Sequence, residues 1–432
     1  MTHYSQLMDK IQNRTAVLGV IGLGYVGLPL AVEKANAGYT VLGFDIQQKR
    51  VDFVNAGHNY IGDVVDSNLS DLVEQKKLVA TTDFSQLSRC DCLAICVPTP
   101  LDGYFQPDIS YVKNSSMEVA KYAHTGMLVV LESTTYPGTT EEIIQPLLEE
   151  KGFTVGQDLF LAFSPERVDP GNAVYKTKNT PKVVGGVTKE CTLLAKTLYG
   201  NVLDSEIHTT SSPKVAEMEK IFENTFRNIN IALANEMAIL CDKMGIPVWE
   251  VIDAAKSKPY GFMAFYPGPG LGGHCIPIDP FYLTWKAREY NYHTRLIEIA
   301  GEINNSMPDY VIGRVADQLN TQKKALNGSK IFVLGLAYKA DIDDIRESPS
   351  ISLIQILTEK GAEVCYNDPF AQTYKNLTSV DITAQSLGDA DLVLIATGHS
   401  AYDPAFILEH ASLVFDSRNI TNGLESPKLR RL

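Results

Sequence analysis

The chain has 432 residues, of which 45% are hydrophobic and 21% charged, as in ordinary soluble globular proteins. At roughly 100–200 residues per domain, this length predicts two to four domains, and the apolar content, which is enough for a core, excludes a mainly disordered chain. The 51 acidic residues outnumber the 38 lysines and arginines, which gives a net charge of −13. Because an acidic surface repels phosphate backbones, we do not expect a nucleic-acid partner, although a small anion could still bind in a local basic pocket.

The cysteines and the one long uncharged run exclude several further classes. Seven cysteines form no CxxC pair, so neither a disulfide framework nor a zinc ribbon is expected, and we predict a reduced, cytoplasmic chain without a metal site. The uncharged run over residues 16–32 contains four glycines and a proline before Glu33 and Lys34. That composition favours a strand, a turn and a helix over a signal peptide or a membrane span.

The first half alternates short apolar segments with helical patterns. A helix is predicted over Leu28–Ala37, ending at Gly38. The predicted strands are Val17–Ile21, Thr40–Phe44, Cys92–Val97, Met127–Leu131 and Phe160–Phe163, with Val183–Val184 as a further candidate. Strands separated by helices need crossover connections, which predicts a parallel sheet.

A long helix is predicted in the middle of the chain. Ser212 can cap it, Pro213 suits its first position, and Gly245 stops it after Met244. Two stripes follow its surface, one apolar (Val215, Met218, Phe222, Thr225, Ile229, Leu233 and Met237) and one polar (Lys220, Asn224 and Arg227). The polar stripe is either a solvated face or the lining of a cleft. Further helices are predicted over Val248–Ala255 and Pro280–Asn304, and this strand-poor block is expected to carry a dimer surface.

The last hundred residues return to strands and repeat the first half weakly. Strands are predicted at Ile331–Gly335, Glu363–Tyr366, Leu392–Ala396 and Leu413–Phe415. The segment VLGVIGLGY at 17–25 resembles KIFVLGLAY at 330–338. The sequence therefore predicts an α/β fold of two Rossmann-like, doubly wound parallel-sheet domains, 1–211 and 326–432, joined by a central all-α domain, 212–325.

A G-x-G-x-x-G motif at Gly22, Gly24 and Gly27 follows the first strand and opens a helix. Gly22 permits the tight turn, Gly24 lets a pyrophosphate approach the backbone, and Gly27 allows close helix packing. Asp45, at the end of the next strand, is placed to bind a ribose and to repel a 2′-phosphate. The motif predicts a dinucleotide site that prefers NAD to NADP.

The second copy lacks the later glycines of this motif. Its turn reads Gly335-Leu336-Ala337-Tyr338-Lys339, and Arg346 follows in the next loop. Two cations without a pyrophosphate turn indicate either a different phosphorylated ligand or two solvated surface charges.

Cys275 lies in a glycine- and proline-rich loop over residues 265–280, beside His274 and four residues before Asp279. A cysteine on such a loop is open to a bulky ligand, so we predict a nucleophile. The other six cysteines stand in apolar or helical contexts and are expected in the core.

Together these features resemble the nucleotide-sugar 6-dehydrogenases, the family of UDP-glucose and UDP-N-acetylhexosamine dehydrogenases. The resemblance covers nearly the whole chain through GLGYVGLP (22–29), VPTP (97–100), ESTTYPGTT (132–140), SPERVDPG (164–171) and GGHCIPIDP (272–280). It implies a cytoplasmic homodimer that oxidises the sugar C6 alcohol to a carboxylate with two molecules of NAD. The intermediates implied are a thiohemiacetal and a thioester on Cys275.

The resemblance also implies residue roles. Lys220 and Asp279 would handle protons and stabilise developing negative charge, Asn224 would hold the intermediate oxygen, and Glu166 would direct water. The implied NAD contacts are Gly22, Gly24, Tyr25, Val26, Gly27, Asp45, Arg50, Thr99 and Thr134. The implied contacts to the nucleotide sugar are Arg167, Val168, Lys220, Asn224, Arg227, Gly272, Lys339 and Arg346.

The loop before Cys275 is most similar to UDP-N-acetylglucosamine enzymes of bacterial surface-polysaccharide pathways, such as lipopolysaccharide synthesis. The mannosamine branch carries a His and an Arg where this chain has Pro259 and Gly261, and UDP-glucose enzymes usually have Ser in place of His274. UDP-N-acetylmannosamine, UDP-N-acetylgalactosamine and UDP-glucose stay open as alternatives.

Two other readings explain less. A catalytically silent regulator that binds NAD and a nucleotide sugar would not need Cys275 and Lys220. A two-electron hydroxyacid dehydrogenase leaves Cys275 and the cationic tail unexplained.

Overall fold

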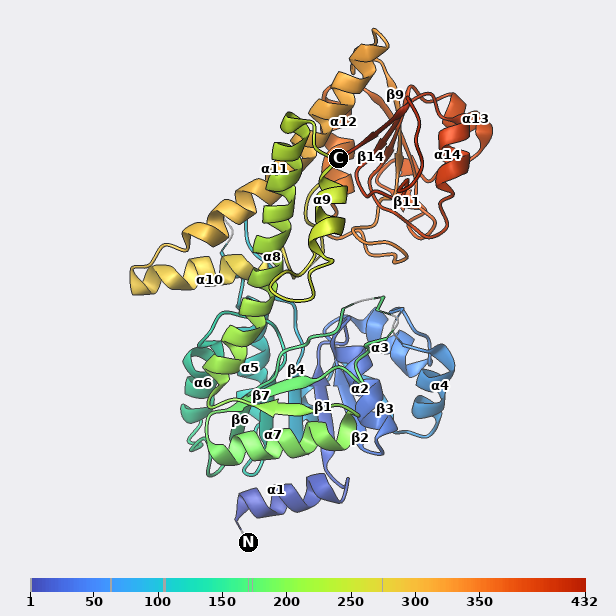
Figure 1. The fold of residues 1–432 in the computed structure, drawn as a ribbon. Helices are drawn as coiled ribbons and strands as arrows, with labels where there is room; N and C mark the ends of the chain where they lie inside the picture. Colours follow the sequence, from blue (N-terminus) through green and yellow to red (C-terminus); the bar gives the residue numbers. More distant parts are fainter. Residues whose placement is uncertain (1, 63, 104–105, 170, 173, 274) are drawn as a thin grey trace. The chain divides into compact units, whose positions relative to one another are not determined.

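A computed structural model of the chain describes residues 2–62, 64–103, 106–169, 171–172, 174–273 and 275–432 (Figure 1). Within it the chain divides into two compact units. The N-terminal unit comprises Met1–Glu223 and Trp285–Asn291, and the C-terminal unit comprises Asn224–Thr284 and Tyr292–Leu432. The predicted boundaries at 211 and 325 stay predictions. Pro170 and His274 lie outside the described residues.

The described residues of the N-terminal unit form an eight-stranded sheet in the order β3-β2-β1-β4-β5-β6-β7-β8. The strands are β1 (Val17–Ile21), β2 (Thr40–Phe44), β3 (Leu78–Thr81), β4 (Cys92–Ile95), β5 (Leu128–Leu131), β6 (Phe160–Phe163), β7 (Lys182–Gly186) and β8 (Ile207–Thr209). Because β1 pairs with both β2 and β4 in parallel, the strand order reverses beside β1, where doubly wound sheets bind ligands. The prediction of a parallel sheet holds except between β6 and β7, which are antiparallel.

Helices cover both faces of this sheet, as a doubly wound fold requires. Alternate β1 residues point to opposite faces: Leu18 packs with residues of the helices α2 and α7, whereas Ile21 packs with residues of α5. The helices are α1 (His3–Gln12), α2 (Gly27–Asn36), α3 (Gln48–Asn55), α4 (Asp66–Glu74), α5 (Ser110–Tyr122), α6 (Gln145–Glu149) and α7 (Lys189–Val202), with the short helices η1 (Phe84–Arg89) and η2 (Thr140–Ile144).

The C-terminal unit contains a second parallel sheet, in the order β10-β9-β13-β14-β15. Its strands are β9 (Lys330–Leu334), β10 (Glu363–Asn367), β13 (Leu392–Ile395), β14 (Val414–Asp416) and β15 (Leu429–Arg431), and β11 (Thr373–Tyr374) pairs with β12 (Leu377–Thr378) alone. The helices α12 (Pro349–Glu359), α13 (Ala384–Gly388) and α14 (Pro404–His410) belong to this unit. The four predicted strands are confirmed, and with them the second Rossmann-like sheet.

The predicted long helix is α8 (Pro213–Met244), and α9 (Val248–Ala255) follows it as predicted. The single helix predicted over Pro280–Asn304 is wrong, because the structure has two helices there, α10 (Asp279–Ala287) and α11 (Arg295–Thr321). A short helix η3 (Arg288–Tyr290) ends at Asn291, whose φ of 53° lies in the left-handed region that asparagine tolerates and that breaks a helix. Across the described ranges, no helix combines the length and the apolar character that a membrane span needs.

Candidate active site

The glycine turn after β1 has the geometry that the motif predicts. Gly22 has φ of +89°, and a Cβ there would lie 2.5 Å from the carbonyl oxygen of Cys96. A Cβ on Gly27 would overlap the carbonyl of Gly22, whereas around Gly24 no described atom lies within 4 Å of the Cβ position. The N-terminus of α2 has no side-chain cap at Val26, so its first amides can bind an anion. These residues fit a pyrophosphate, and the neighbouring Tyr25 is exposed.

Asp45 follows β2 and is almost fully buried. Its carboxylate accepts hydrogen bonds from the backbone amides of Leu23 and Gln47 at 3.0 and 2.9 Å, and from Arg50 at 3.2 Å. Arg50, on α3, could attract a 2′-phosphate, but here its charge is paired with Asp45. The arrangement therefore fits a ribose hydroxyl better than a phosphate.

Thr99 and Thr134 follow β4 and β5. The Thr99 hydroxyl donates to the carbonyl of Thr134 at 2.7 Å, which joins the two strand ends. Because β1, β2, β4 and β5 are parallel neighbours, the predicted NAD contacts lie along one edge of the sheet.

Glu166, Arg167 and Val168 form the loop after β6. One oxygen of Glu166 accepts hydrogen bonds from the amides of Arg167 and Val168, both at 2.8 Å. The guanidinium of Arg167 forms an ion pair with Glu223 and lies 3.5 Å from Glu219, both on α8. Burial, together with the charge of Glu223, raises the pKa of Glu219 to about 7.

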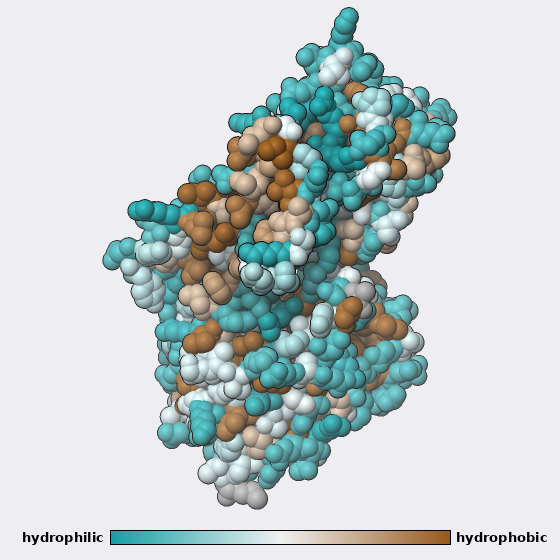
Figure 2. Space-filling model, in the orientation of Figure 1, coloured by the Kyte–Doolittle hydropathy of each residue, from teal (hydrophilic) through white to brown (hydrophobic). Residues whose placement is uncertain are grey.

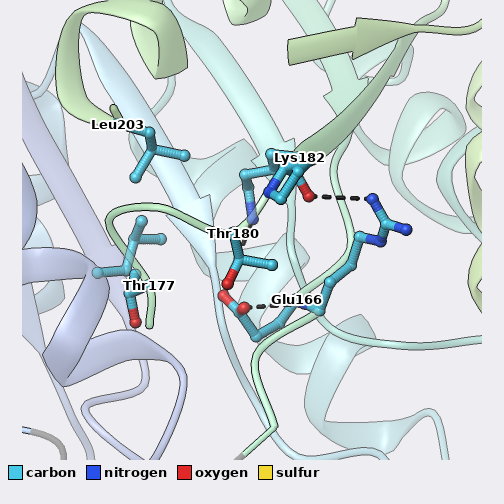
Figure 3. Close-up of a pocket in the computed structure, with 8 residues that line it drawn as sticks. Glu166, Thr177, Thr180, Lys182 and Leu203 are labelled. Carbon is cyan, nitrogen blue, oxygen red and sulfur yellow. Dashed lines mark hydrogen bonds and ion pairs between the residues drawn. The ribbon is translucent and has the colours of Figure 1, made fainter. Parts of the chain in front are cut away.

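Glu166 and Arg167 also line a small pocket of the N-terminal unit together with residues of α2, of β7 and the segment before it, and of the C-terminal end of α7 (Figure 3). Its other lining residues are Leu30, Thr177, Thr180, Pro181, Lys182 and Leu203.

The two stripes of α8 are arranged opposite to the simplest expectation. Lys220 and Asn224 are 7% and 4% exposed, whereas Phe222 and Leu233 of the apolar stripe are 67% and 53% exposed. The polar stripe is thus not a solvated face, except at Arg227, which is exposed.

Asn224 connects α8 to the cysteine loop within the C-terminal unit. Its amide donates to Asp279 at 2.5 Å, and Asp279 is the first residue of α10 and is buried. The neighbouring Asn228 donates to the carbonyl of Ile276 at 3.2 Å. Two side-chain amides of α8 therefore hold the segment after Cys275, one at Ile276 and the other at Asp279.

Cys275 is exposed, whereas five of the other cysteines are buried and Cys365 is half-buried. Burial raises the pKa of Cys90, Cys92 and Cys96, so these thiols are held in the unreactive protonated form. The carbonyl of Cys275 accepts the amides of Ile278 and Asp279. The reactive cysteine that we expected is thus the one with the most access.

The cysteine loop packs closely on the turn after β9. A Cβ on Gly272 would lie 2.6 Å from Cβ of Tyr338, and a Cβ on Gly273, whose φ is +92°, would lie 2.9 Å from the ring of Tyr338. Lys339 follows Tyr338 directly. Arg346 binds Asp344 through three contacts of 2.6–3.1 Å. The predicted residues Cys275, Gly272 and Lys339 are therefore neighbours in one unit.

Sequence reasoning did not single out two cations with little exposure, Lys182, which is buried, and Arg418, which is half-buried. Lys182, at the start of β7, is 5% exposed and contacts Glu132. Arg418, after β14, donates to the carbonyl of Ala396 at 2.8 Å, and a Cβ on Gly268 would lie 2.5 Å from its guanidinium; burial, opposed by Asp416, lowers its pKa to about 10. A charged residue at the edge of an apolar strand was the signal available for both.

Comparison with known proteins identifies the family. Models of the UDP-glucose/GDP-mannose dehydrogenase family match in order: the NAD binding domain at residues 16–203, the central domain at 214–306 and the UDP binding domain at 332–423. Protein CapL of Staphylococcus aureus is 37% identical over 424 residues, which are 96% of this chain and 98% of the relative. A UDP-N-acetyl-D-glucosamine 6-dehydrogenase of Pseudomonas aeruginosa is 36% identical over 389 residues, 89% of this chain and 91% of that protein.

A solved structure named UDP-D-ManNAc dehydrogenase, from Pyrococcus horikoshii, superposes with a TM-score of 0.89 at 34% identity, covering 96% of this chain and 98% of that one. The predicted resemblance and the predicted cofactor, NAD, are confirmed by these matches. The chain belongs to the UDP-glucose/GDP-mannose dehydrogenase family and is an NAD-dependent oxidoreductase.

Proposed function

We propose that this enzyme oxidises C6 of UDP-N-acetylglucosamine to the uronic acid, for bacterial surface-polysaccharide synthesis. One alcohol, two NAD⁺ and one water give one carboxylate, two NADH and three protons. NAD, when bound, accepts the hydride in each oxidation. The residues of this chain bind the sugar nucleotide, hold the intermediate and move the protons.

Cys275 holds the intermediate. Its thiolate adds to the C6 aldehyde, so that a C–S bond forms and the aldehyde oxygen becomes the alkoxide or hydroxyl of a thiohemiacetal. Loss of a hydride turns this adduct into a thioester. Water then adds, the C–S bond breaks, and the thiolate is regenerated as the acid leaves. Asn224, bonded to Asp279, and Lys220 stabilise the oxyanions, and Glu166 directs the water.

The observation that carries the proposal is the placement of Cys275. It is exposed on a loop whose glycines pack on the turn that bears Lys339, and α8 holds the same loop through Asn224 and Asn228. A nucleophile for C6 and a cation for the nucleotide end are thereby neighbours within one unit.

Cys275→Ala tests this mechanism. Acid formation should fall to background while NAD binding and the melting temperature stay unchanged, because removing one loop thiol opens no core cavity. Mass spectrometry of quenched wild-type enzyme should find a sugar-nucleotide adduct on the Cys275 peptide, and Cys365→Ala should retain it. Near-normal acid formation by Cys275→Ala would overturn the covalent route.

The sugar is tested with a panel of UDP-N-acetylglucosamine, UDP-N-acetylmannosamine, UDP-N-acetylgalactosamine and UDP-glucose. Relatives named for N-acetylglucosamine and for N-acetylmannosamine are equally similar, at 35–37% identity, so the support for the first comes from Pro259 and Gly261, where the mannosamine branch carries a His and an Arg. The solved structure named for N-acetylmannosamine favours the second as the competing substrate. The substrate with the highest kcat/KM and two NADH per sugar decides between them.

We also propose that the enzyme is a homodimer. Exposed apolar side chains of the C-terminal unit gather over α8 and α11 (Figure 2), among them Phe226, Leu233, Leu240, Leu296 and Ile299. Contiguous apolar surface of this kind marks protein interfaces. Light scattering should give twice the chain mass, and Leu233→Glu should give the monomer mass, whereas the neighbouring exposed change Glu236→Gln should not. A monomeric wild type would refute this.

A further inference from the structure

Three buried side chains, Glu132, Lys182 and Tyr199, form a hydrogen-bonded cluster next to the Glu166 loop. Lys182 donates to Glu132 at 2.7 Å and to the carbonyl of Pro165 at 3.1 Å. Tyr199, from α7, donates to the other oxygen of Glu132. The ammonium of Lys182 also lies 5.1 Å from the centre of the Tyr199 ring. The side chain of Glu132 is fully buried, so packing and these hydrogen bonds fix the position of the cluster.

The cluster connects two segments of the proposed site. Glu132 directly follows β5 and precedes Ser133 and Thr134, whereas Pro165 and Glu166 follow β6. Because β7 is antiparallel to β6, its first residue, Lys182, lies at the edge where β5 and β6 end. One side chain therefore holds both strand ends.

Lys182 also faces the second oxygen of Glu166. The first oxygen accepts the two loop amides, and the second lies 3.9 Å from the ammonium of Lys182 (Figure 3). Burial alone would lower the pKa of Lys182, but Glu132 and Glu166 outweigh it and raise that pKa. The ammonium of Lys34 lies 5.8 Å from the centre of the Tyr199 ring, and burial lowers the pKa of Lys34. Lys182 therefore keeps its positive charge beside Glu166, and the neighbouring Arg167, which also interacts with Glu166, is paired with Glu223.

We propose that Lys182, fixed by Glu132 and Tyr199, is a positioning residue that holds the Glu166 carboxylate in the orientation needed for the thioester hydrolysis of the proposed function. The inference rests on the proposed function, because it requires the thioester. In this step water adds to the thioester carbonyl, Glu166 accepts one proton, and the C–S bond breaks to release the acid and the thiolate. Lys182 keeps its own proton throughout.

The experiment must separate positioning from folding. Lys182→Met leaves Glu132 as an unpaired buried charge, which can unfold a protein, so the double variant Glu132→Gln/Lys182→Met removes both charges together. Lys182→Arg preserves the charge. Lys178→Met is the matched control, since Lys178 pairs with Asp204 on the surface of the same segment.

Each variant is checked for melting temperature and NAD affinity and then mixed with UDP-N-acetylglucosamine and NAD. In the folded double variant we expect steady-state acid formation to fall ~100-fold, at the low end of what acid–base groups contribute. NADH should still form in a burst, KM should change little, and the thioester should accumulate on the Cys275 peptide, as it should in Glu166→Gln. Lys182→Arg should recover part of the rate, and Lys178→Met should match the wild type.

The outcomes separate the two proposals. Wild-type enzyme that makes no acid from any sugar of the panel would refute the proposed function. If Glu166→Gln accumulates thioester while the folded double variant turns over normally, Lys182 is only structural and the inference is wrong. A double variant that accumulates thioester at unchanged melting temperature supports it.

Discussion

The mainly parallel N-terminal sheet and the parallel C-terminal sheet have the same backbone hydrogen bonds after their first strands but different side chains and different free space there. Gly22 and Gly335 end the first strand of each sheet with φ of +89° and +92°. Their amides donate to Phe44 and Asn367, the last residues of the neighbouring strands, at 2.7 and 2.8 Å. The internal repeat seen in the sequence is therefore a repeat of hydrogen bonds as well.

The acid after the second strand shows the difference. Asp45 accepts three hydrogen bonds, whereas Asp368 accepts five, four from backbone amides and one from His399. A carboxylate offers about four lone-pair sites. Asp368 is therefore saturated by its own chain, and only Asp45 retains capacity for a ribose.

The turns after the first strands also differ, because the turn of the N-terminal sheet has free space and that of the C-terminal sheet is filled by its own chain. No described atom lies near the Cβ position of Gly24, whereas Ala337 is fully buried, with its amide bound to Asp368 and its carbonyl to Thr397. The comparison shows that this backbone arrangement can bind a dinucleotide only under two conditions. The carboxylate after the second strand must retain a free lone pair, and the turn after the first strand must leave space for the pyrophosphate.

The largest effect should come from filling the space in the first turn. Gly24→Val should weaken NAD binding by ~100-fold or more, because a branched side chain would occupy the place of the pyrophosphate. The fold should persist, since the Cβ meets no described atom. Calorimetric titration with NAD measures this, with Gly200→Val in α7, another open glycine, as the control. Unchanged NAD affinity would contradict the assignment of the turn.

In the C-terminal unit, Arg346→Ala should raise KM for the UDP-sugar by ~10- to 100-fold, because the loss of one hydrogen bond to a charged group weakens binding by about that factor. KM for NAD should change little. Arg314→Ala, which also removes an arginine paired with acids of the same unit, is the control. A change confined to the NAD constant would reverse the roles of the two sheets.

A smaller effect is expected at Asp45. Asp45→Ala should weaken NAD binding by ~10-fold, the loss of a charge-assisted hydrogen bond. It should narrow the preference for NAD over NADP, because Arg50 would lose its partner and become available to a 2′-phosphate. Initial rates with both cofactors measure the ratio. Equal efficiency with NAD and NADP in the wild type would refute the role of Asp45.

Replacing Asp368 should lower the free energy of unfolding and leave NAD binding unchanged. Burial opposes its ionisation, but the bonds from His399 and the backbone amides outweigh burial and lower its pKa to about 2. Its contribution to stability should therefore be present above pH 4 and be lost as the pH falls toward 2. Asp368→Asn should destabilise by ~1–3 kcal/mol at neutral pH.

The difference between Asp368→Asn and the wild type should shrink below pH 4. Urea unfolding across that range measures it. A constant difference at all pH values would show that the charge of Asp368 is unimportant.

Local patterns predicted much of the fold and several groups of the site. Short continuous apolar runs marked strands such as Thr40–Phe44 and Phe160–Phe163, because a strand buried on both faces is apolar along its whole length. The failures lie where distant contacts decide. The break at Asn291 and the antiparallel β7 have no strong local signal. The sequence marks Lys182 only as a charge at the edge of an apolar strand, because its partners, Glu132 and Tyr199, are 50 and 17 residues away.

The sequence by itself determined the two glycine turns, the long helix and the one cysteine on a glycine loop, since backbone freedom, capping and periodicity are properties of neighbouring residues. Only the tertiary structure decided which face of α8 is buried, which carboxylate is saturated and which lysine is enclosed. Burial of a polar group depends on whether partners from other elements replace its water. For Asn224 that partner is Asp279, 55 residues further along the chain.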